Sequence, residues 1–315
     1  MPKIHSLKPE RKTLHGPFDR SLPPVLSIDS GDTVYVQTLD AGWSVGPKKD
    51  PGGRRVKFPE FDRERDAGHS LVGPIKIDGA KPGDTLEIKI NEIVPGPYGW
   101  TCGGGFPSYQ NKKMGIADPP EKELDFLIDR EKMTASSQFG DFSYEIPIRP
   151  FMGLMGMPPE EPGQHSTTPP RYCGGNIDCK ELVAGSTLYL PIPVEGGLFS
   201  VGDGHAVQGD GEVAGPALEC PMEHVSLTLT VCKDMKLSMP RAKTPAGWIT
   251  FGFHEDLNEA MWTALDEMVS FMTELYSIPR KEAYALASLT VDLHISQIVN
   301  TVKGVHAILP YGAIR

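Results

Sequence analysis

Three turns of related sequence recur along the chain, and each one leads into a segment of alternating apolar and polar residues. The turns read SGDT at residues 30–33, PGDT at 82–85 and AGST at 184–187. After the second turn comes LEIKINEI, whose first, third and fifth residues are apolar. Alternation with a period of two is typical of a β-strand with one buried face, and glycine gives a tight turn its backbone freedom. The pattern predicts a chain of short strands joined by turns.

The strand pattern extends over most of the chain. Residues 225–231 read VSLTLTV and alternate in the same way, so strands are predicted from about residue 25 to about residue 232. The 34 glycines and 30 prolines among 315 residues exceed average usage and favour turns over long helices. We therefore predict a mainly β fold, with a jelly-roll-like β-sandwich as its body.

The last quarter of the chain has a different pattern. Over residues 257–276 apolar side chains recur every three or four positions, and Asp256 followed by Glu259 resembles a capping box, which predicts a helix. We expect the methionines of this helix to pack in a core. A proline just after it can begin a second, shorter helix, followed by extended segments. We divide the chain into a β-rich body, residues 1–235, and an α/β portion with C-terminal helices, residues 236–315, packed on it as one unit.

Charge and cysteine content exclude several classes of protein. The formal net charge of −10 argues against a nucleic-acid partner, because such binding depends on clustered lysine and arginine. The 5 cysteines form no CxxC pair and predict neither a disulfide framework nor a zinc ribbon. The N-terminal residues lack the apolar core of a signal peptide, and no run of about 18 apolar residues occurs. We expect a cytoplasmic protein without a membrane partner.

Two segments are long and poor in periodicity. Residues 95–120 and 156–175 are rich in glycine and proline, and both are longer than ordinary connections between strands. Loops of this length often have a function. We expect them to lie over a sheet, because they carry aromatic residues.

The segment 201–212, VGDGHAVQGDGE, is the most unusual in the chain. Its carboxylates cannot be buried unpaired, and its glycines allow the backbone to approach an ion or ligand closely. Asp203 and His205 are two residues apart, so they point to one side of an extended segment, and Asp210 and Glu212 repeat this spacing. Histidine with several carboxylates and no thiolate is a ligand set for Zn²⁺, Mn²⁺ or Fe²⁺, or for a mixed site with Ca²⁺ or Mg²⁺. The alternative for this segment alone is a surface hairpin with acidic turns.

Other polar residues stand at predicted strand ends or in glycine-rich turns. Asp40 follows the strand-like YVQTL, and His69 follows a glycine. The segment GGNID contains Asn176 and Asp178, and Glu219 ends the segment GPALE. Ligands are commonly displayed at such positions on a rigid sheet. These residues favour the metal-site interpretation over the hairpin.

The remaining candidates are weaker. His254 and His294 lie in periodic segments and are expected to be packing residues, while His165 lies in a loop that we expect to be solvated. Cys220 stands beside a glutamate, which raises the pKa of a thiol, and has no evident base for a cysteine amidase. The chain has no GxSxG elbow and no phosphate-binding loop.

Taken together, these residues make the chain resemble the acetamidase/formamidase family, in the family's order and over most of its length. The motif GDGHAVQGDGE is specific to this family. The segments that carry the resemblance are TLDA (38–41), GHSLVGPIKIDGAKPGDTLEIKI (68–90), RPFMGLMGMPP (149–159), GGNIDCKELVAGSTLYLPIPVEGGLFSVGDGHAVQGDGEVAGPALE (174–219) and AYALASLTVDLHISQIVN (283–300).

The resemblance implies hydrolysis of formamide or acetamide to the acid and ammonia by a cytoplasmic homo-oligomer, a homodimer or larger. It also implies a metal-dependent site, with zinc and calcium as candidate ions in a binuclear arrangement. The family positions in this sequence are Asp40, His69, Asp178, Asp203, His205, Glu212 and Glu219.

We expect these positions to have different roles in the cleavage of an unreactive amide. The expected metal ligands are His69, Asp203 and His205, with Asp40 and Asp178 as further ligands. Glu219 is the expected general base, with Glu212 in reserve. The expected amide-binding residues are Gln208, Asp292 and Gln297, and the candidate walls of a tight pocket are Trp100, Phe106 and Met155.

Two functions of other classes remain open at this point. A β-sandwich that binds carbohydrate through structural calcium would keep the acidic loops, but it would not need His69 and His205, because calcium prefers oxygen ligands. A cupin-like oxygenase with ferrous iron would show more histidines close together than this chain does. The two histidines favour the metal-dependent amidase.

Overall fold

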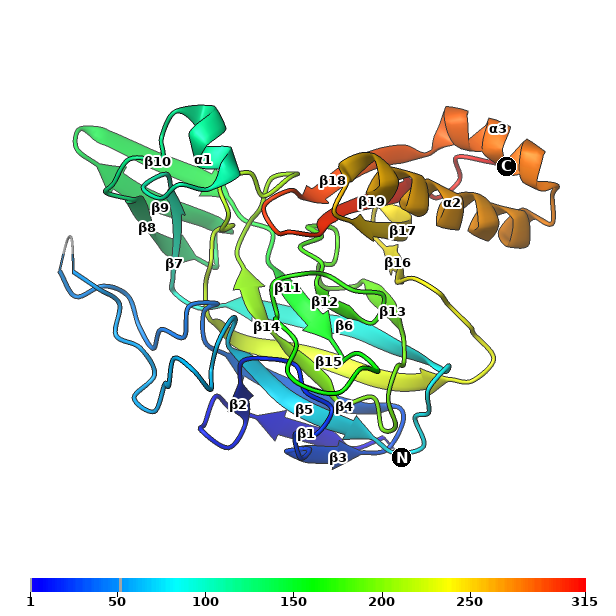
Figure 1. The fold of residues 1–315 in the computed structure, drawn as a ribbon, viewed down its shortest axis with the longest axis horizontal. Helices are drawn as coiled ribbons and strands as arrows, with labels where there is room; N and C mark the ends of the chain where they lie inside the picture. The colour runs from blue at the N-terminus through cyan, green and yellow to red at the C-terminus, as the bar shows by residue number, and fades with distance from the viewer. Residues whose placement is uncertain (1, 51–52) are drawn as a thin grey trace.

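The computed structural model describes residues 2–50 and 53–315, and strands dominate it (Figure 1). Strands make up 40% of the protein and helices 12%, so the predicted mainly β fold with C-terminal helices is confirmed. The strands of the described residues form three sheets. None of the helices in these residues is both long enough and apolar enough to cross a membrane.

The largest sheet has nine strands and runs from the N-terminal to the C-terminal part of the molecule. Its order is β1-β4-β15-β6-β13-β16-β17-β19-β18, and β1 with β4 is its parallel pair. Its strands are β1 (Ile4–Leu7), β4 (Asp32–Thr38), β6 (Thr85–Pro95), β13 (Thr187–Pro191), β15 (Met222–Cys232), β16 (Arg241–Thr244), β17 (Gly247–His254), β18 (Asp292–Gln297) and β19 (Lys303–Leu309).

Two smaller sheets complete the body. One has the order β12-β11-β14-β5-β2, with β3 added alongside β5, and the other has the order β10-β9-β8-β7. The first contains β2 (Leu14–His15), β3 (Leu26–Ile28), β5 (Leu71–Ile77), β11 (Phe151–Gly156), β12 (Gly174–Asn176) and β14 (Phe199–His205). The second contains β7 (Tyr98–Gly103), β8 (Lys122–Asp129), β9 (Thr134–Phe139) and β10 (Phe142–Pro147), and it stands out from the body in Figure 1.

The three recurring turns have one geometry. In each turn the glycine has a left-handed backbone, with φ of 95° at Gly31, 84° at Gly83 and 89° at Gly185. The residue after it donates its backbone N–H to the carbonyl three residues earlier, at 3.1 Å for Asp32 and 3.0 Å for Asp84. The predicted alternation follows in the first half of β6, where Leu86, Ile88 and Ile90 are fully buried and the polar residues between them are not. The sequence pattern therefore sets which face of this strand meets the core.

The nine-stranded and six-stranded sheets share one apolar core. From the first sheet it takes Val34, Val36, Ile88, Ile90, Leu227 and Leu229, and from the second Val72, Ile75, Met152, Met155, Phe199 and Val201. These side chains are buried, as expected for a two-layered package in which each sheet contributes one apolar face. This core makes a rigid base for the ends of β11, β12 and β14.

The C-terminal helices cover the far end of the nine-stranded sheet. Helix α2 (Leu257–Tyr276) packs on β17 and β19, and α3 (Arg280–Thr290) packs on α2 (Figure 1). The two helices share a second core with these strands, which includes Met268 and Met272. The predicted core role of the methionines is thus confirmed. The division at residue 235 stays a prediction, and β13 before it is hydrogen-bonded to β16 after it in the same sheet.

Two local predictions need correction. The Asp256 side chain caps α2 by accepting a hydrogen bond from Asn258 N at 2.8 Å. The backbone N–H of Asp256 donates to His254 Nδ1 at 2.9 Å, so only half of the predicted capping box forms. His254, which was expected to be a packing residue, is exposed. The segment 95–120 is not a plain loop, because it contains β7 and the short helix α1 (Tyr109–Met114). Pairing of β7 with β8, far along the chain, supplies the order that local periodicity did not reveal.

Candidate functional site

The unusual segment begins in β14, and three of its polar residues, Asp203, His205 and Glu212, lie in a buried cluster. His205 Nε2 lies 3.4 Å from Asp203 Oδ1 and 3.3 Å from Glu219 Oε1. Asp178, His205 and Glu212 also have one potential ligand atom each within 4.8 Å of one another. We call Asp178, Asp203, His205, Glu212 and Glu219 the His205 cluster. Asp203 and His205 thus lie together, as predicted.

Three of the four carboxylates in the His205 cluster sit on a strained backbone. The φ angles are 51° at Asp178, 57° at Asp203 and 46° at Glu212, all in the left-handed region. Residues other than glycine adopt this region at a cost, and they do so mainly where function or tertiary packing requires it. The backbone therefore turns these side chains toward His205 against its local preference.

Strand β11 leaves room for the cluster at Gly153. A Cβ atom there would lie 2.7 Å from Asp203 Oδ2, 2.7 Å from His205 Cε1 and 2.8 Å from Asp178 Oδ1. No other residue type fits at this position without displacing these groups. Gly153 was not among the predicted site residues, although a glycine inside a strand-like segment often marks a close approach of other groups to the backbone.

The His205 cluster carries more negative charge than the protein balances. Burial raises the pKa of Asp178 and Glu212 well above the usual range, and their neighbouring carboxylates add to the effect. Burial also raises the pKa of Glu219, against the pull of His205. For His205, burial would lower the pKa, but Glu219 and Asp203 outweigh it and raise the value. Four buried carboxylates around one imidazole call for an added cation.

Unpartnered atoms in the cluster fit a metal ion. Both carboxylate oxygens of Asp178, both ring nitrogens of His205 and Oε2 of Glu219 are buried without a hydrogen-bond partner in the described residues. Buried polar atoms are nearly always bonded to something. Oxygen and imidazole nitrogen donors in this mixture suit a divalent ion. The residues present therefore fit the metal that the sequence predicts.

A cavity of about 310 Å³ opens onto the cluster. Its lining includes His69, which is half-buried and held by Thr167 Oγ1 at 2.8 Å from Nδ1 and at 3.0 Å from the backbone N. His69 is near enough to Asp203 to help lower the pKa of that carboxyl. Trp100 lines the cavity as predicted, but Phe106 is exposed and Met155 belongs to the core.

These features can be compared with known proteins. The family model described as the acetamidase/formamidase family matches residues 3–166 and 161–313. The chain belongs to this family.

Solved and curated relatives cover different shares of the chain. The acetamidase of Yersinia enterocolitica is 26% identical, with a TM-score of 0.84 over 100% of this chain and 94% of that one. The acetamidase of Bacillus halodurans is 27% identical, with a TM-score of 0.82 over 97% of each chain. The formamidase of Methylophilus methylotrophus is 27% identical over 64% of this chain and 59% of its own length. The matches to curated relatives span 49% to 67% of the lengths of those relatives.

Asp40 lies beside the His205 cluster but not in it. Asp40 is buried, and its Oδ1 accepts from Ser44 N at 2.8 Å while Oδ2 accepts from Trp100 Nε1 at 3.1 Å. Burial raises the pKa of Asp40, against these hydrogen bonds. Its oxygens thus hold the turn after β4 and orient the cavity wall.

The residues predicted to bind the amide do not line the cavity. Gln208 Nε2 donates to the carbonyls of Asp178 at 2.8 Å and Ser296 at 3.1 Å. Gln297, the last residue of β18, is buried, and its Nε2 donates to Val302 O at 2.7 Å. Asp292 is exposed. Two asparagines, Asn176 and Asn300, line the cavity instead. Asn300 was missed because only the fold brings the β18–β19 connection to this place.

The predicted pairing of Asp210 with Glu212 on one side is wrong. Asp210 faces outward and pairs with Lys180 and with His294 Nδ1, the latter at 2.8 Å. Gly211 and Glu212 both have left-handed φ angles, of 92° and 46°, so the segment is not extended there. His294 is therefore an ion-pair partner and not simply a packing residue.

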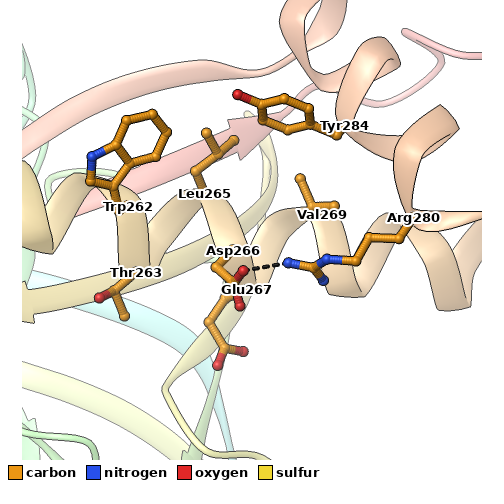
Figure 2. Close-up of a pocket in the computed structure, with 8 residues that line it drawn as sticks. All are labelled: Trp262, Thr263, Leu265, Asp266, Glu267, Val269, Arg280 and Tyr284. Carbon is orange, nitrogen blue, oxygen red and sulfur yellow. Dashed lines mark hydrogen bonds and ion pairs between the residues drawn. The ribbon is translucent and has the colours of Figure 1, made fainter.

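A second hollow on the surface lacks the chemistry of a catalytic site. It lies along α2 and α3, has a volume of about 410 Å³ and holds an Asp266–Arg280 ion pair (Figure 2). Trp262 and Tyr284 on its wall are exposed. Its ionisable groups lie in water, so the buried His205 cluster is the better candidate.

Proposed function

We propose that this protein hydrolyses short aliphatic amides, formamide or acetamide, to the carboxylic acid and ammonia at the cavity above the His205 cluster. The observation that carries the proposal is the set of buried, unpartnered carboxylate and imidazole atoms at a small cavity in a chain of the acetamidase/formamidase family. We further propose that the protein is a cytoplasmic homo-oligomer.

The proposed site holds a divalent metal, zinc or a zinc–calcium pair. We assign Asp178, Asp203 and His205 as ligands, with His69 on the cavity side. Asp40 is left out of this set because both of its oxygens are hydrogen-bonded elsewhere. When bound, such an ion would lower the pKa of a coordinated water to about 7 and polarise a carbonyl.

Glu219 is the proposed general base. Its Oε1 accepts from Ala217 N at 3.0 Å, which holds the carboxylate in place, and its Oε2 is free of partners in the described residues. A buried carboxylate with a raised pKa can take a proton from water and deliver it to the departing nitrogen. Glu212, on the other side of His205, remains in reserve.

The residues of the cavity wall are proposed to position the substrate and to restrict its size. Formamide and acetamide offer little remote binding energy, so a tight pocket must position them. Trp100 supplies an apolar wall that Asp40 orients, and Asn176 and Asn300 supply amide groups able to hydrogen-bond a substrate amide. A methyl group changes the preference between these two substrates by about 1–3 kcal/mol.

Ammonia release from formamide and acetamide tests the proposal. The protein is assayed as isolated, after chelation, and after zinc is added back with and without calcium, beside a sample dialysed without chelator. We expect activity to disappear on chelation and to return with metal. Full activity after measured metal removal would overturn the metal mechanism. No activity in any metal state would favour the carbohydrate-binding alternative.

A further inference from the structure

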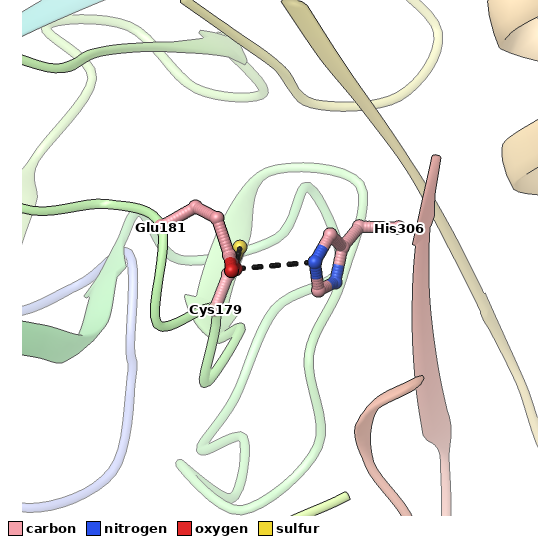
Figure 3. A group of neighbouring side chains, drawn as sticks. All are labelled: Cys179, Glu181 and His306. Carbon is pink, nitrogen blue, oxygen red and sulfur yellow. Dashed lines mark hydrogen bonds and ion pairs between the residues drawn. The ribbon is translucent and has the colours of Figure 1, made fainter. Parts of the chain in front are cut away.

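A second buried group of metal-binding side chains lies outside the cavity. Cys179 and Glu181 follow β12, and His306 lies on β19, which brings distant parts of the chain together (Figure 3). Glu181 Oε2 is 3.4 Å from Cys179 Sγ and 3.1 Å from His306 Nε2. All three residues are buried, and none lines the cavity of the His205 cluster. We call these three residues the Cys179 cluster.

In this cluster a hydrogen bond to one ring nitrogen of His306 orients the side chain, and the other ring nitrogen has no hydrogen-bond partner in the described residues. Its Nδ1 is hydrogen-bonded to Ser296 Oγ at 2.8 Å, and its ring stacks on His294 with centroids 5.2 Å apart. Its Nε2 is buried, and in the described residues it has no hydrogen-bond partner of adequate geometry, although Glu181 is near. Histidines that bind metals are typically held in this way through the other ring nitrogen.

The glutamate of the cluster is supported from its far side. Its Oε1 faces Lys180 Nζ at 3.6 Å and Arg149 at 4.0 Å, while Oε2 faces the thiol and the imidazole. Lys180 is itself paired with Asp210. One oxygen is thus held by cations and the other is presented to the cluster, as expected for a carboxylate that binds through a single oxygen.

We propose that Cys179 Sγ, Glu181 Oε2 and His306 Nε2 bind a zinc-type divalent ion. Bond lengths of about 2.0–2.3 Å in a tetrahedral site place such donors about 3.4–3.6 Å apart. The two observed separations, 3.4 and 3.1 Å, need only a small expansion. On binding, the thiol releases its proton to solvent and a metal–sulfur bond replaces it. A thiolate and a carboxylate then neutralise the ion.

The ion cross-links two parts of the fold and takes no part in amide hydrolysis. It ties the loop after β12 to β19, and Cys179 is the neighbour in sequence of Asp178. None of the three donors lines the cavity, and a water molecule would complete a tetrahedral set. Binding here therefore stabilises the contact between the β-rich body and the C-terminal portion, whatever the substrate of the enzyme.

Cobalt(II) substitution tests this site directly. The chelated full-length protein is titrated with Co²⁺, and absorption is recorded in the near ultraviolet, where thiolate-to-cobalt charge transfer appears. The His205 cluster has no cysteine, but the chain has four other free thiols, so the band is assigned to Cys179 only where Cys179→Ser removes it. We expect the band in the wild type, its loss in Cys179→Ser, and its persistence in Cys173→Ser, a buried control whose thiol donates to Met157 O.

Bound metal per chain gives a second readout. We expect His306→Gln to bind one equivalent less than the wild type, and Cys173→Ser to bind the same amount. Absence of the band in the wild type, or a band of equal strength in Cys179→Ser, would overturn the proposal even if other variants fail to fold. Ammonia release, measured separately, keeps the outcome distinct from that of the proposed function.

Discussion

The His205 cluster and the Cys179 cluster each bury glutamate beside histidine, but they balance charge in opposite ways. Burial would raise the pKa of Glu181, but His306 and Lys180 outweigh it and lower the value to about 2. Burial raises the pKa of Glu212 well above its usual range, and Asp178 adds to the rise. One cluster is thus stable within the protein alone, whereas the other has an excess of carboxylates that an added cation would relieve.

The two clusters also differ in backbone conformation. In the His205 cluster three carboxylates have left-handed φ angles, while none of the residues of the Cys179 cluster does. Strain is retained where the surrounding structure enforces a geometry that the local chain disfavours. The comparison teaches that strain and unbalanced charge together mark the proposed catalytic site, and that burial of ionisable groups alone does not.

The largest expected effect comes from filling the gap in the His205 cluster. Gly153→Ala places a methyl group within 2.7–2.8 Å of Asp178, Asp203 and His205, so these groups must move. We expect ammonia release to fall by at least about 100-fold, because displacements near 1 Å are that costly in an active site. Gly103→Ala, in a strand position with no neighbour within 4 Å, is the matched control. Wild-type rates in Gly153→Ala would refute our placement of the site.

Removal of the proposed base should cost nearly as much. Glu219→Gln is expected to lower turnover of formamide by about 10²- to 10⁴-fold, since no group then takes the proton from water. Metal content, measured on the same sample, should stay near that of the wild type. Asp203→Asn, by contrast, should lose metal and activity together. Retained turnover in Glu219→Gln would move the base to Glu212.

In the chelated protein, replacing glutamate by glutamine should change the free energy of unfolding in opposite directions in the two clusters. Glu181→Gln removes the partner of buried His306 and is expected to lower the free energy of unfolding by about 3 kcal/mol. Glu212→Gln removes repulsion with Asp178 and should raise it by about 1 kcal/mol. Denaturant unfolding of both variants measures the difference. Equal signs would contradict the charge-balance argument.

The stabilisation by Glu181 should also depend on pH. Because its pKa is lowered from 4.5 to about 2 by folding, its contribution is present above pH 4.5 and is lost as the pH falls toward 2. In the chelated protein, the gap between wild type and Glu181→Gln should shrink from about 3 kcal/mol at pH 7 to about half of that at pH 3. Unfolding curves across this range test it, and a constant gap would show that the ion pair is not its source.

The smallest effect is expected beside the His205 cluster, at the wall that Asp40 supports. Trp100→Phe leaves Asp40 Oδ2 without its indole donor at 3.1 Å and should lower the free energy of unfolding by about 1 kcal/mol. It should also raise the KM for the amide while kcat changes less. Trp262→Phe, at an exposed position, should change neither. An unchanged KM in Trp100→Phe would separate this wall from substrate binding.

Local sequence signals were sufficient for much of the fold and for part of the candidate site. Alternation predicted β4, β6 and β15, and the three- to four-residue period predicted α2 over 257–276, its observed bounds. These features depend on neighbours in the chain, which share one strand face or one helix face. Asp203 and His205 lie together in β14 as predicted, but the left-handed φ of 57° at Asp203 shows that regular strand alternation is not what orients them.

Only the tertiary structure decided which distant residues meet. It separated Asp210 from Glu212 through left-handed backbone angles, occupied Asp40 with Trp100, and set Gly153 against three charged groups. It also brought His306 to Cys179 and Glu181, a cluster that no spacing in the sequence announces. The physical reason is that local periodicity reports which face a side chain takes, whereas pairing between remote strands and the balance of buried charge are settled only when the chain packs.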